Sequence, residues 1–151
     1  TEMQATTELL LYAAARAQHL VEKIFPALNR GAIVICDRFS DSTIAYQGFG
    51  RNIAKELIDS LDAIATGHFR PHLTFLCDLN VQEGLTRNRI ANKSDRLEQE
   101  SIAFHEKVRN GFLFLAKQEP DRFRIIDASR HPQIIAVEIF EHVKRVLCNS
   151  A

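Results

Sequence analysis

The residues best suited to chemistry lie in "DRFSDSTIAYQGFGR", residues 37–51. This stretch opens on an acid–base pair, Asp37 and Arg38, directly after the apolar run "AIVIC". An arginine offers a planar fork that matches a phosphate or carboxylate, and an aspartate beside it can orient an arginine or approach a hydrated Mg²⁺. Ligands of open α/β sheets bind beyond the carboxyl ends of the strands, so the pair is well placed for anion binding. A surface salt bridge at a strand end is the alternative.

Polar and aromatic side chains follow this pair at once. Hydroxyl, phenol, amide and guanidinium groups come from Ser42, Thr43, Tyr46, Gln47 and Arg51. Hydrogen-bonding groups beside an aromatic ring and two arginines suit a small, planar, anionic ligand such as a nucleotide. Gly48 and Gly50 would allow close approach of the backbone. A polar loop that enters a helix is the alternative.

A second cluster lies in the first predicted helix. Tyr12 and Arg16 are i,i+4 neighbours on one helix face. A ring that stacks on a base, beside a guanidinium that hydrogen-bonds the edge of the base, would form a base clamp. An ordinary exposed Tyr–Arg pair is the alternative.

A third cluster is cationic and occupies "TRNRIANKSDRLEQE", residues 86–100. Its four basic residues are Arg87, Arg89, Lys93 and Arg96. A mobile basic segment that closes on phosphates suits phosphoryl transfer, where catalysis is mostly positioning and charge neutralisation. Glu98 is a candidate outer-shell magnesium partner. A solvated helix end with local ion pairs is the alternative.

Apolar periodicity predicts the elements that must hold these side chains. The predicted helices cover residues 7–28, 52–66, 81–90, 99–117 and 132–147, and the predicted strands cover residues 32–37, 73–79 and 123–128. Buried strands that alternate with helices favour an α/β architecture with a mostly parallel sheet. Three strands are few for such a sheet, which typically has about five. We therefore expect partner strands outside this sequence.

Composition narrows the class of protein. The 151 residues suit one domain, and 19 basic residues balance 19 acidic ones, so no global field favours nucleic acid or anionic lipid. The sequence predicts neither a membrane-spanning helix nor a signal peptide. Three cysteines without a CxxC pair indicate buried free thiols in a reducing cytosol rather than a zinc site. The start at Thr1 indicates a processed or truncated chain.

Five blocks in this order resemble bacterial thymidylate kinase over nearly the whole chain: "ELLLYAAARAQH", "VICDRFSDSTIAYQGFGR", "FRPHLTFLCDL", "GLTRNR…DRLEQE" and "F…VRNGFLFLA". The resemblance implies the P-loop nucleoside-monophosphate-kinase fold, a three-layer α/β fold with a mostly parallel sheet. It also implies transfer of a phosphoryl group from ATP to dTMP with Mg²⁺, in cytoplasmic dTTP synthesis by a homodimer formed through the first helix. Residues 1–151 would be a single domain, the C-terminal two-thirds to three-quarters of such an enzyme, with a LID over about 87–96.

The resemblance assigns the charged positions to phosphates and metal. Arg38 would hold the dTMP phosphate, and Asp37 would support the magnesium and phosphate region. The LID that closes over ATP would include or adjoin three basic residues, Arg87, Arg89 and Lys93. Glu98 matches a carboxylate position near the metal in some relatives.

The resemblance assigns the remaining positions to the nucleoside. Tyr12 would stack on thymine, and Arg16 would hydrogen-bond the edge of the base. Ser42 and Thr43 would line the base pocket. Tyr46 would sit beneath the deoxyribose and leave no room for a 2′-hydroxyl. Two further residues, Gln47 and Arg51, belong to the same loop.

Departures from the family pattern limit what this sequence is expected to do. Two features of the family are missing from these residues: the N-terminal strand and the GxxxxGK[ST] loop that cradles ATP phosphates. The LID departs as well, since "IANK" stands where relatives often carry another arginine near Ala91. We expect the 151-residue chain alone to lack appreciable kinase activity. Two alternatives stay open: a non-catalytic dTMP-binding or dimerisation remnant, and a sibling kinase for another deoxynucleotide.

Overall fold

The computed structural model describes residues 3–90, 96–97 and 99–149. The chain divides into two compact units. The first comprises residues 1–70 and 103–115, and the second comprises residues 71–102 and 116–151. Each unit has its own buried apolar residues, among them Leu9 and Leu20 in the first and Ile126 in the second.

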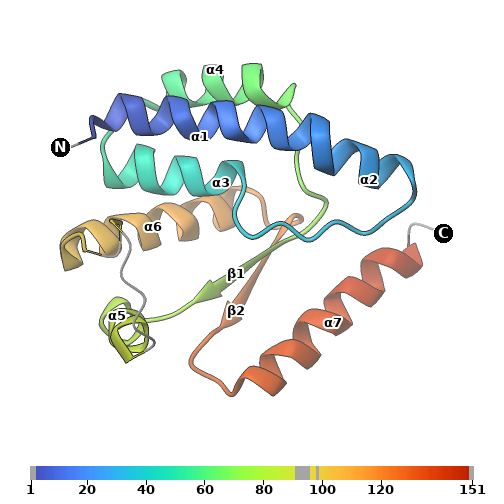
Figure 1. Cartoon of the computed structure of the whole chain (residues 1–151). Coiled ribbons are helices and arrows are strands. Elements are labelled where there is room, and N and C mark those ends of the chain that lie inside the picture. The colour runs from blue at the N-terminus through green and yellow to red at the C-terminus, as the bar shows by residue number, and fades with distance from the viewer. Residues whose placement is uncertain (1–2, 91–95, 98, 150–151) are drawn as a thin grey trace. The chain divides into compact units, whose positions relative to one another are not determined.

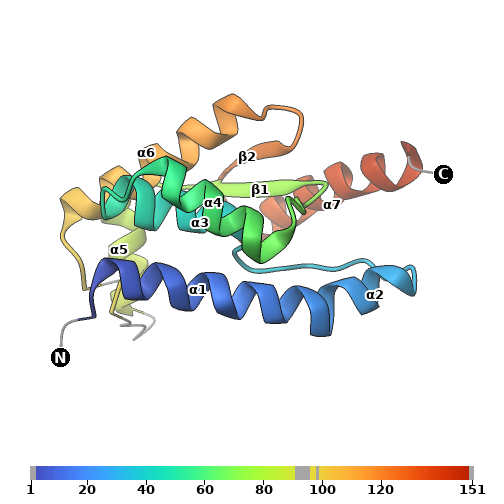
Figure 2. The same ribbon diagram turned by 90° about the horizontal axis from the view of Figure 1, so that it is seen from above.

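A long helical rod begins the first unit. α1 (Ala5–His19), the π-helical segment η1 (Leu20–Ile24) and α2 (Phe25–Asn29) follow one another without a break (Figure 2). Pro26 lies in the first turn of α2, where it cannot donate a backbone hydrogen bond and its ring crowds the carbonyl one turn back. The wider π turn directly before it accommodates that defect. The predicted helix over 7–28 is thus confirmed, and the rod ends where Gly31 adopts a positive φ of 75°.

Residues 40–50 are helical, where the sequence predicted no helix. α3 (Ser40–Thr43) runs directly into the π-helical segment η2 (Ile44–Gly50). Two glycines in seven residues give η2 a low intrinsic helix propensity, so tertiary packing decides its conformation. At Gly50 an added Cβ would lie 2.6 Å from the Phe104 ring of α6 (Ile102–Gln118), which shows how closely the two helices pack.

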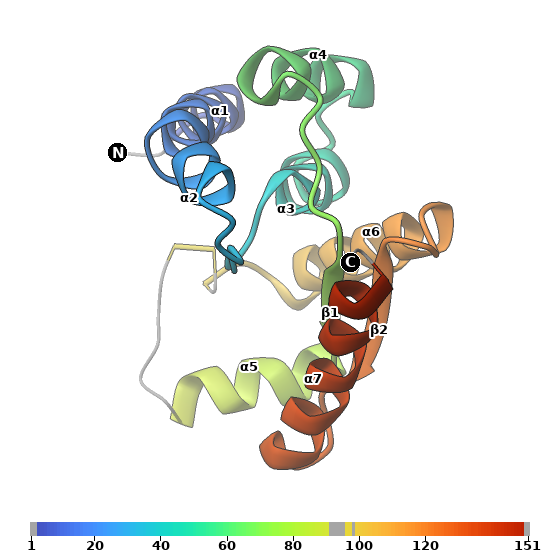
Figure 3. The ribbon, with the colours of Figure 1, turned by 90° about the vertical axis from the view of Figure 1, so that its right-hand side faces the viewer.

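α4 (Lys55–Thr66) also belongs to the first unit and packs against α1 (Figure 3). The predicted helix over 52–66 is confirmed with a start three residues later. Ile58 is buried on its inner face, and Gly67 ends the helix with a left-handed φ of 59°.

The second unit contains a two-stranded parallel sheet (Figure 1). β1 (Thr74–Asp78) pairs with β2 (Phe123–Asp127) in a register that places Asp78 opposite Asp127. α5 (Val81–Ile90) follows β1, and α7 (Pro132–Asn149) follows β2 and places His142 6.1 Å from the ring of Phe75. The predicted α/β class with a parallel sheet is therefore confirmed.

α7 spreads its apolar residues among charged ones such as Glu138, Glu141 and Lys144. In the described part of the chain, no helix combines the length and the hydrophobicity needed to cross a membrane.

The predicted strand over 32–37 is wrong. Residues 32–36 form neither helix nor strand, and Asp37 lies in a bend. Ile33 is 65% exposed and Ile35 is 94% exposed. β-branched residues favour a strand only when a neighbouring strand supplies hydrogen bonds and packing. Within the described residues, the ladder joins β1 to β2 only.

The expectation of buried thiols is wrong as well. Cys36, Cys77 and Cys148 are free and exposed. Cys36 belongs to the segment that forms no strand, which explains its exposure. Partial burial still raises the pKa of the Cys36 and Cys77 thiols, and the neighbouring Asp37 carboxylate adds to the rise at Cys36.

Replacing Gly50 with alanine tests the close packing of η2 on α6. The new Cβ would lie 2.6 Å and 2.9 Å from two carbons of the buried Phe104 ring, so the ring or the helix must shift. We expect Gly50→Ala to lower the free energy of unfolding by about 1–3 kcal/mol in urea titrations. The control is Gly84→Ala in α5, where the nearest atom lies 3.9 Å away. That change should raise stability by about 0.5–1 kcal/mol through helix propensity. Equal stabilisation by both changes would contradict the packing argument.

Candidate functional site

The nucleoside-side residues predicted from the sequence all lie in the first unit. They come from α1, from the bend before α3, from α3 and η2, and from the residue after η2: Tyr12, Arg16, Asp37, Arg38, Ser42, Thr43, Tyr46, Gln47 and Arg51. The helical form of residues 40–50 brings the side chains at i and i+4 onto one face, so Thr43 and Gln47 point the same way. Both are buried.

Arg16 links α1 to this second segment. Its Nη2 donates to Oγ1 of Thr43 at 2.5 Å and to the carbonyl of Phe39 at 3.5 Å. Its guanidinium carbon lies 5.5 Å from the centroid of the Phe39 ring. The predicted base-edge arginine and the predicted pocket-lining threonine are therefore in direct contact.

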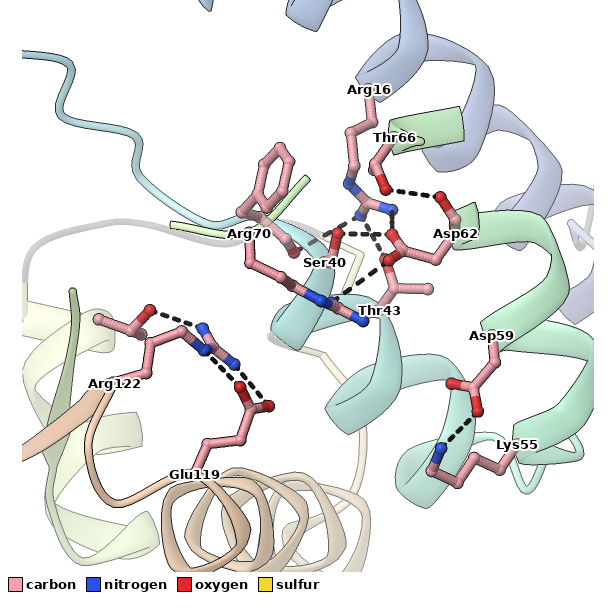
Figure 4. A network of polar contacts seen from close by, with 12 residues as sticks. Arg16, Ser40, Thr43, Lys55, Asp59, Asp62, Thr66, Arg70, Glu119 and Arg122 are labelled. Atoms are coloured by element: carbon pink, nitrogen blue, oxygen red, sulfur yellow. Dashed lines mark hydrogen bonds and ion pairs between the residues drawn. The ribbon is translucent and has the colours of Figure 1, made fainter. Parts of the chain in front are cut away.

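Asp62, on α4, is the acceptor for the other terminal nitrogen of Arg16 (Figure 4). Nη1 of Arg16 and Oδ1 of Asp62 are 3.3 Å apart. Oγ of Ser40 donates to the same oxygen at 2.5 Å, and Nη1 of Arg70 approaches Oδ2 at 3.3 Å. Thr66 fixes the backbone at this point by donating its hydroxyl to the Asp62 carbonyl. Asp62 thus joins α1, α3 and the segment after α4.

The environment of Arg16 has two opposing electrostatic effects. Burial lowers the pKa of its guanidinium from the ordinary value, while the Asp62 and Asp41 carboxylates oppose that shift. The ordinary pKa of an arginine lies so far above neutral pH that the group stays charged there. A permanent cation is therefore held inside the unit by carboxylates.

Glu8 forms a second buried link between α1 and η2. Its Oε1 accepts a hydrogen bond from Nε2 of Gln47 at 2.6 Å and lies 3.8 Å from Nε of Arg51. The guanidinium of Arg51 also stacks 4.8 Å from the centroid of the Phe104 ring. Gln47 and Arg51 are therefore held by protein partners.

Arg38 occupies an unusual backbone conformation. Its φ is +71°, in the left-handed region that costs a non-glycine residue about 1–2 kcal/mol. The side chain is exposed, and its guanidinium lies 4.9 Å from the centroid of the Tyr46 ring. The same ring also packs against Phe104 and Phe112. The strain and the stack together hold an exposed cation beside Tyr46.

Three predicted residues have less protein contact. Tyr12 is 44% exposed and lies one turn before Arg16 on the same face of α1. Asp37 is exposed and Ser42 is half-buried. These side chains remain accessible to a ligand.

The predicted LID residues belong to the second unit or fall outside the described residues. Arg87 lies on α5, where Nη1 donates to the carbonyl of Ala128 at 2.8 Å and Nη2 pairs with Glu83 at 2.6 Å. Arg89 is exposed near the end of α5. Lys93 and Glu98 lie outside the described residues. Among the residues that are described, no three His, Cys, Asp or Glu side chains gather as a protein-built metal cage would require.

Sequence reasoning missed Asp62 and Glu8. Both look like ordinary charged residues of amphipathic helices, and their partners lie 46 and 39 positions away in the chain. One signal was present for Glu8: it stands one turn before Tyr12 and two turns before Arg16, on the face already chosen as functional. No local pattern indicated Asp62.

Sequence comparison identifies close relatives. The pattern that defines the thymidylate kinase family matches residues 1–139. A thymidylate kinase of Geobacter sulfurreducens is 56% identical over 133 residues, which cover 84% of this chain and 62% of the relative. One of Trichlorobacter lovleyi is 48% identical over 149 residues, 95% of this chain and 70% of the relative. This chain thus spans less than two-thirds of the Geobacter protein.

Comparison with solved structures also finds a thymidylate kinase. The crystal structure of thymidylate kinase from Ehrlichia chaffeensis matches with a TM-score of 0.75 and 32% sequence identity. The match covers 95% of this chain and 68% of the other. It confirms the predicted nucleoside-monophosphate-kinase type of α/β fold.

The strain at Arg38 can be measured by comparing two substitutions. Arg38→Gly and Arg38→Ala both remove the guanidinium, but only alanine keeps a Cβ in the left-handed region. We expect the glycine variant to be more stable by about 1 kcal/mol in urea unfolding. Asp59, in the middle of α4, is the control, because glycine there should be less stable than alanine by about 1 kcal/mol. If the glycine and alanine variants rank in the same order of stability at positions 38 and 59, the backbone of Arg38 is not strained.

Proposed function

Since this chain belongs to the thymidylate kinase family, we propose that it supplies the dTMP-binding side of a kinase that converts dTMP and ATP to dTDP and ADP. The observation that carries the proposal is the contact of Arg16 with Thr43, held by Asp62. A cation and a hydroxyl fixed together can hydrogen-bond the edge of a pyrimidine. Both substrates are charged nucleotides that do not cross a bilayer unaided, so we propose a cytoplasmic location in dTTP synthesis.

The proposed binding mode uses side chains of the same site. Arg38, stacked on Tyr46, would donate to the dTMP phosphate, since a guanidinium fork matches phosphate oxygens. Tyr46 would lie beneath the deoxyribose. Tyr12 would stack on thymine, and its exposed ring leaves room for that contact. Ser42, Gln47 and Arg51 would complete the pocket wall.

Mg²⁺ and ATP are proposed as the remaining components. Mg²⁺ keeps several waters and binds through one or two carboxylates together with substrate phosphates. The exposed carboxylate of Asp37 fits such a site, and Glu98 is the second proposed carboxylate. Mg²⁺ would neutralise charge on the phosphates when bound. Arg87, Arg89 and Lys93 are proposed to contact ATP from the LID.

A calorimetric titration tests the acceptor site. We expect the 151-residue chain to bind dTMP, and Arg38→Ala to weaken binding about tenfold to a hundredfold through loss of a charge-assisted hydrogen bond. Arg30→Ala, which removes an exposed arginine after α2, is the control and should leave affinity unchanged. These residues contain no GxxxxGK[ST] sequence, so the same preparation should release no ADP when ATP is added. Equal affinity of wild type and Arg38→Ala would refute the phosphate role, and ADP release would refute the expected inactivity.

Self-association through the first helix is also proposed. Leu10, Ala14 and Val21 recur at i, i+4 and i+11 along the rod and are all exposed. An exposed apolar stripe of this kind suits the same stripe of a second copy around a two-fold axis. The proposed complex is a homodimer.

Placing a charge in the stripe tests this homodimer. Val21 is 65% exposed, so Val21→Glu should not disturb the fold of one chain. Desolvation of the carboxylate in an interface should weaken self-association at least about tenfold in sedimentation equilibrium. Val137→Glu, at a similarly exposed position on α7, is the control. An unchanged association constant for Val21→Glu would exclude this stripe of the rod as the interface.

A further inference from the structure

We propose that Asp62 positions Arg16 so that its guanidinium reads a carbonyl oxygen at the C4 edge of a pyrimidine. Asp62 is thereby a specificity-determining residue, although it acts through Arg16 and not by contact with the ligand. The inference rests on the proposed function, because it presumes a pyrimidine nucleotide beside Arg16.

The surroundings of the Asp62 carboxylate fix its geometry. The Asp62 side chain is 6% exposed and the Arg16 side chain 10% exposed, so water has little access to compete for their hydrogen bonds. Oδ1 accepts from Arg16 and from Ser40, while Oδ2 faces Arg70 (Figure 4). With both oxygens engaged from different directions, the carboxylate has one available orientation.

The fixed carboxylate in turn imposes an orientation on Arg16. Nη1 is held by Asp62, and Nη2 is held by Thr43 and the Phe39 carbonyl. These contacts with described residues use three of the five N–H groups of a guanidinium. Anchors on both terminal nitrogens fix the plane of the group, and so fix where its remaining donors point.

The chemistry of the base edge then decides which bases a fixed guanidinium accepts. A guanidinium only donates hydrogen bonds, so it favours a base with an acceptor at that edge. Thymine and uracil carry a carbonyl oxygen at C4, whereas cytosine carries an amino group there. A fixed donor therefore rejects cytosine, because the two sets of N–H groups would face each other.

The competing explanation is purely structural. In that case Asp62 only ties α1 to α4 as a buried ion pair, and its loss would lower stability without changing base preference. The positioning role predicts a different effect. A neutral residue at position 62 would leave Arg16 near the like charge of Arg70, so the orientation of Arg16 would be held less firmly. The ratio of affinities for two bases separates the two explanations.

The test is a calorimetric comparison of dTMP, dUMP and dCMP. In the wild-type chain we expect dTMP and dUMP to bind more tightly than dCMP. In Asp62→Asn the ratio of dTMP to dCMP affinity should fall about tenfold, chiefly by loss of dTMP affinity, as a charge-assisted hydrogen bond becomes misaligned. The matched control is Asp59→Asn on the same helix, which breaks the exposed pair with Lys55 and should leave the ratio unchanged.

A second variant, Ser40→Ala, provides the test if Asp62→Asn does not fold. Ser40→Ala removes one donor to Oδ1 and leaves the ion pair in place. It should reduce the same ratio by a smaller factor of about two to five, since the carboxylate becomes less tightly held.

The outcomes distinguish the two proposals. If folded Asp62→Asn keeps the wild-type ratio of dTMP to dCMP affinity, the positioning role is overturned while dTMP binding stands. If Asp62→Asn does not fold, a wild-type ratio in Ser40→Ala has the same meaning. Absence of dTMP binding by the wild-type chain overturns the proposed function and the role of Asp62 with it. A reduced ratio with intact Asp59→Asn supports both.

Discussion

Charge buried between α1, α3, η2 and α4 is the constraint on which the first unit depends. An arginine or carboxylate taken out of water costs several kcal/mol unless a partner meets it with good geometry. Arg16 and Glu8 project from α1, and their partners Asp62 and Gln47 project from α4 and η2. Each pair spans two elements, so the helices can only pack in the arrangement that brings both pairs together. Apolar contacts such as those of Leu9 and Ile58 favour burial in general, while the charges select one packing.

Several departures from local backbone preferences lie in this unit, two of them at Asn52 and His68, which have positive φ, and others within residues 37–51. Arg38 is left-handed, and η2 is π-helical with glycine in close contact with an aromatic ring. The features at Arg38 and in η2 are not favoured by their own sequence, and each is held by the surrounding packing. Proteins tolerate such features where a side chain or carbonyl must be aimed, because regular helices and loops offer few directions. Residues 37–51 combine those at Arg38 and in η2, which agrees with a binding role.

Sequence predicted those parts of the fold and site that depend on local pattern. The helical rod, α4 to α7 and the two paired strands follow from periodicity, and chemical type singled out Arg16 and Thr43, which the structure brings into contact. Features that depend on distant partners could not be predicted. The run at 32–37 has strand composition, but a strand also needs a neighbour. Asp62 has the composition of a surface position, and only a fold that brings Arg16 to it makes it an acceptor.

The two sets of arginines differ in how firmly the protein holds them. The Arg16 side chain is only 10% exposed, and giving up its partners for those of a ligand would leave Asp62 with Arg70 as its one cationic partner among the described residues, so Arg16 must enter binding already oriented. Arg87 is about half exposed, and its pair with Glu83 is of the kind that contributes between zero and about 1 kcal/mol. A phosphate can therefore displace Glu83 at little cost. In the proposed kinase, base recognition is built in before the ligand arrives, whereas the arginines assigned to ATP can be recruited when phosphates bind.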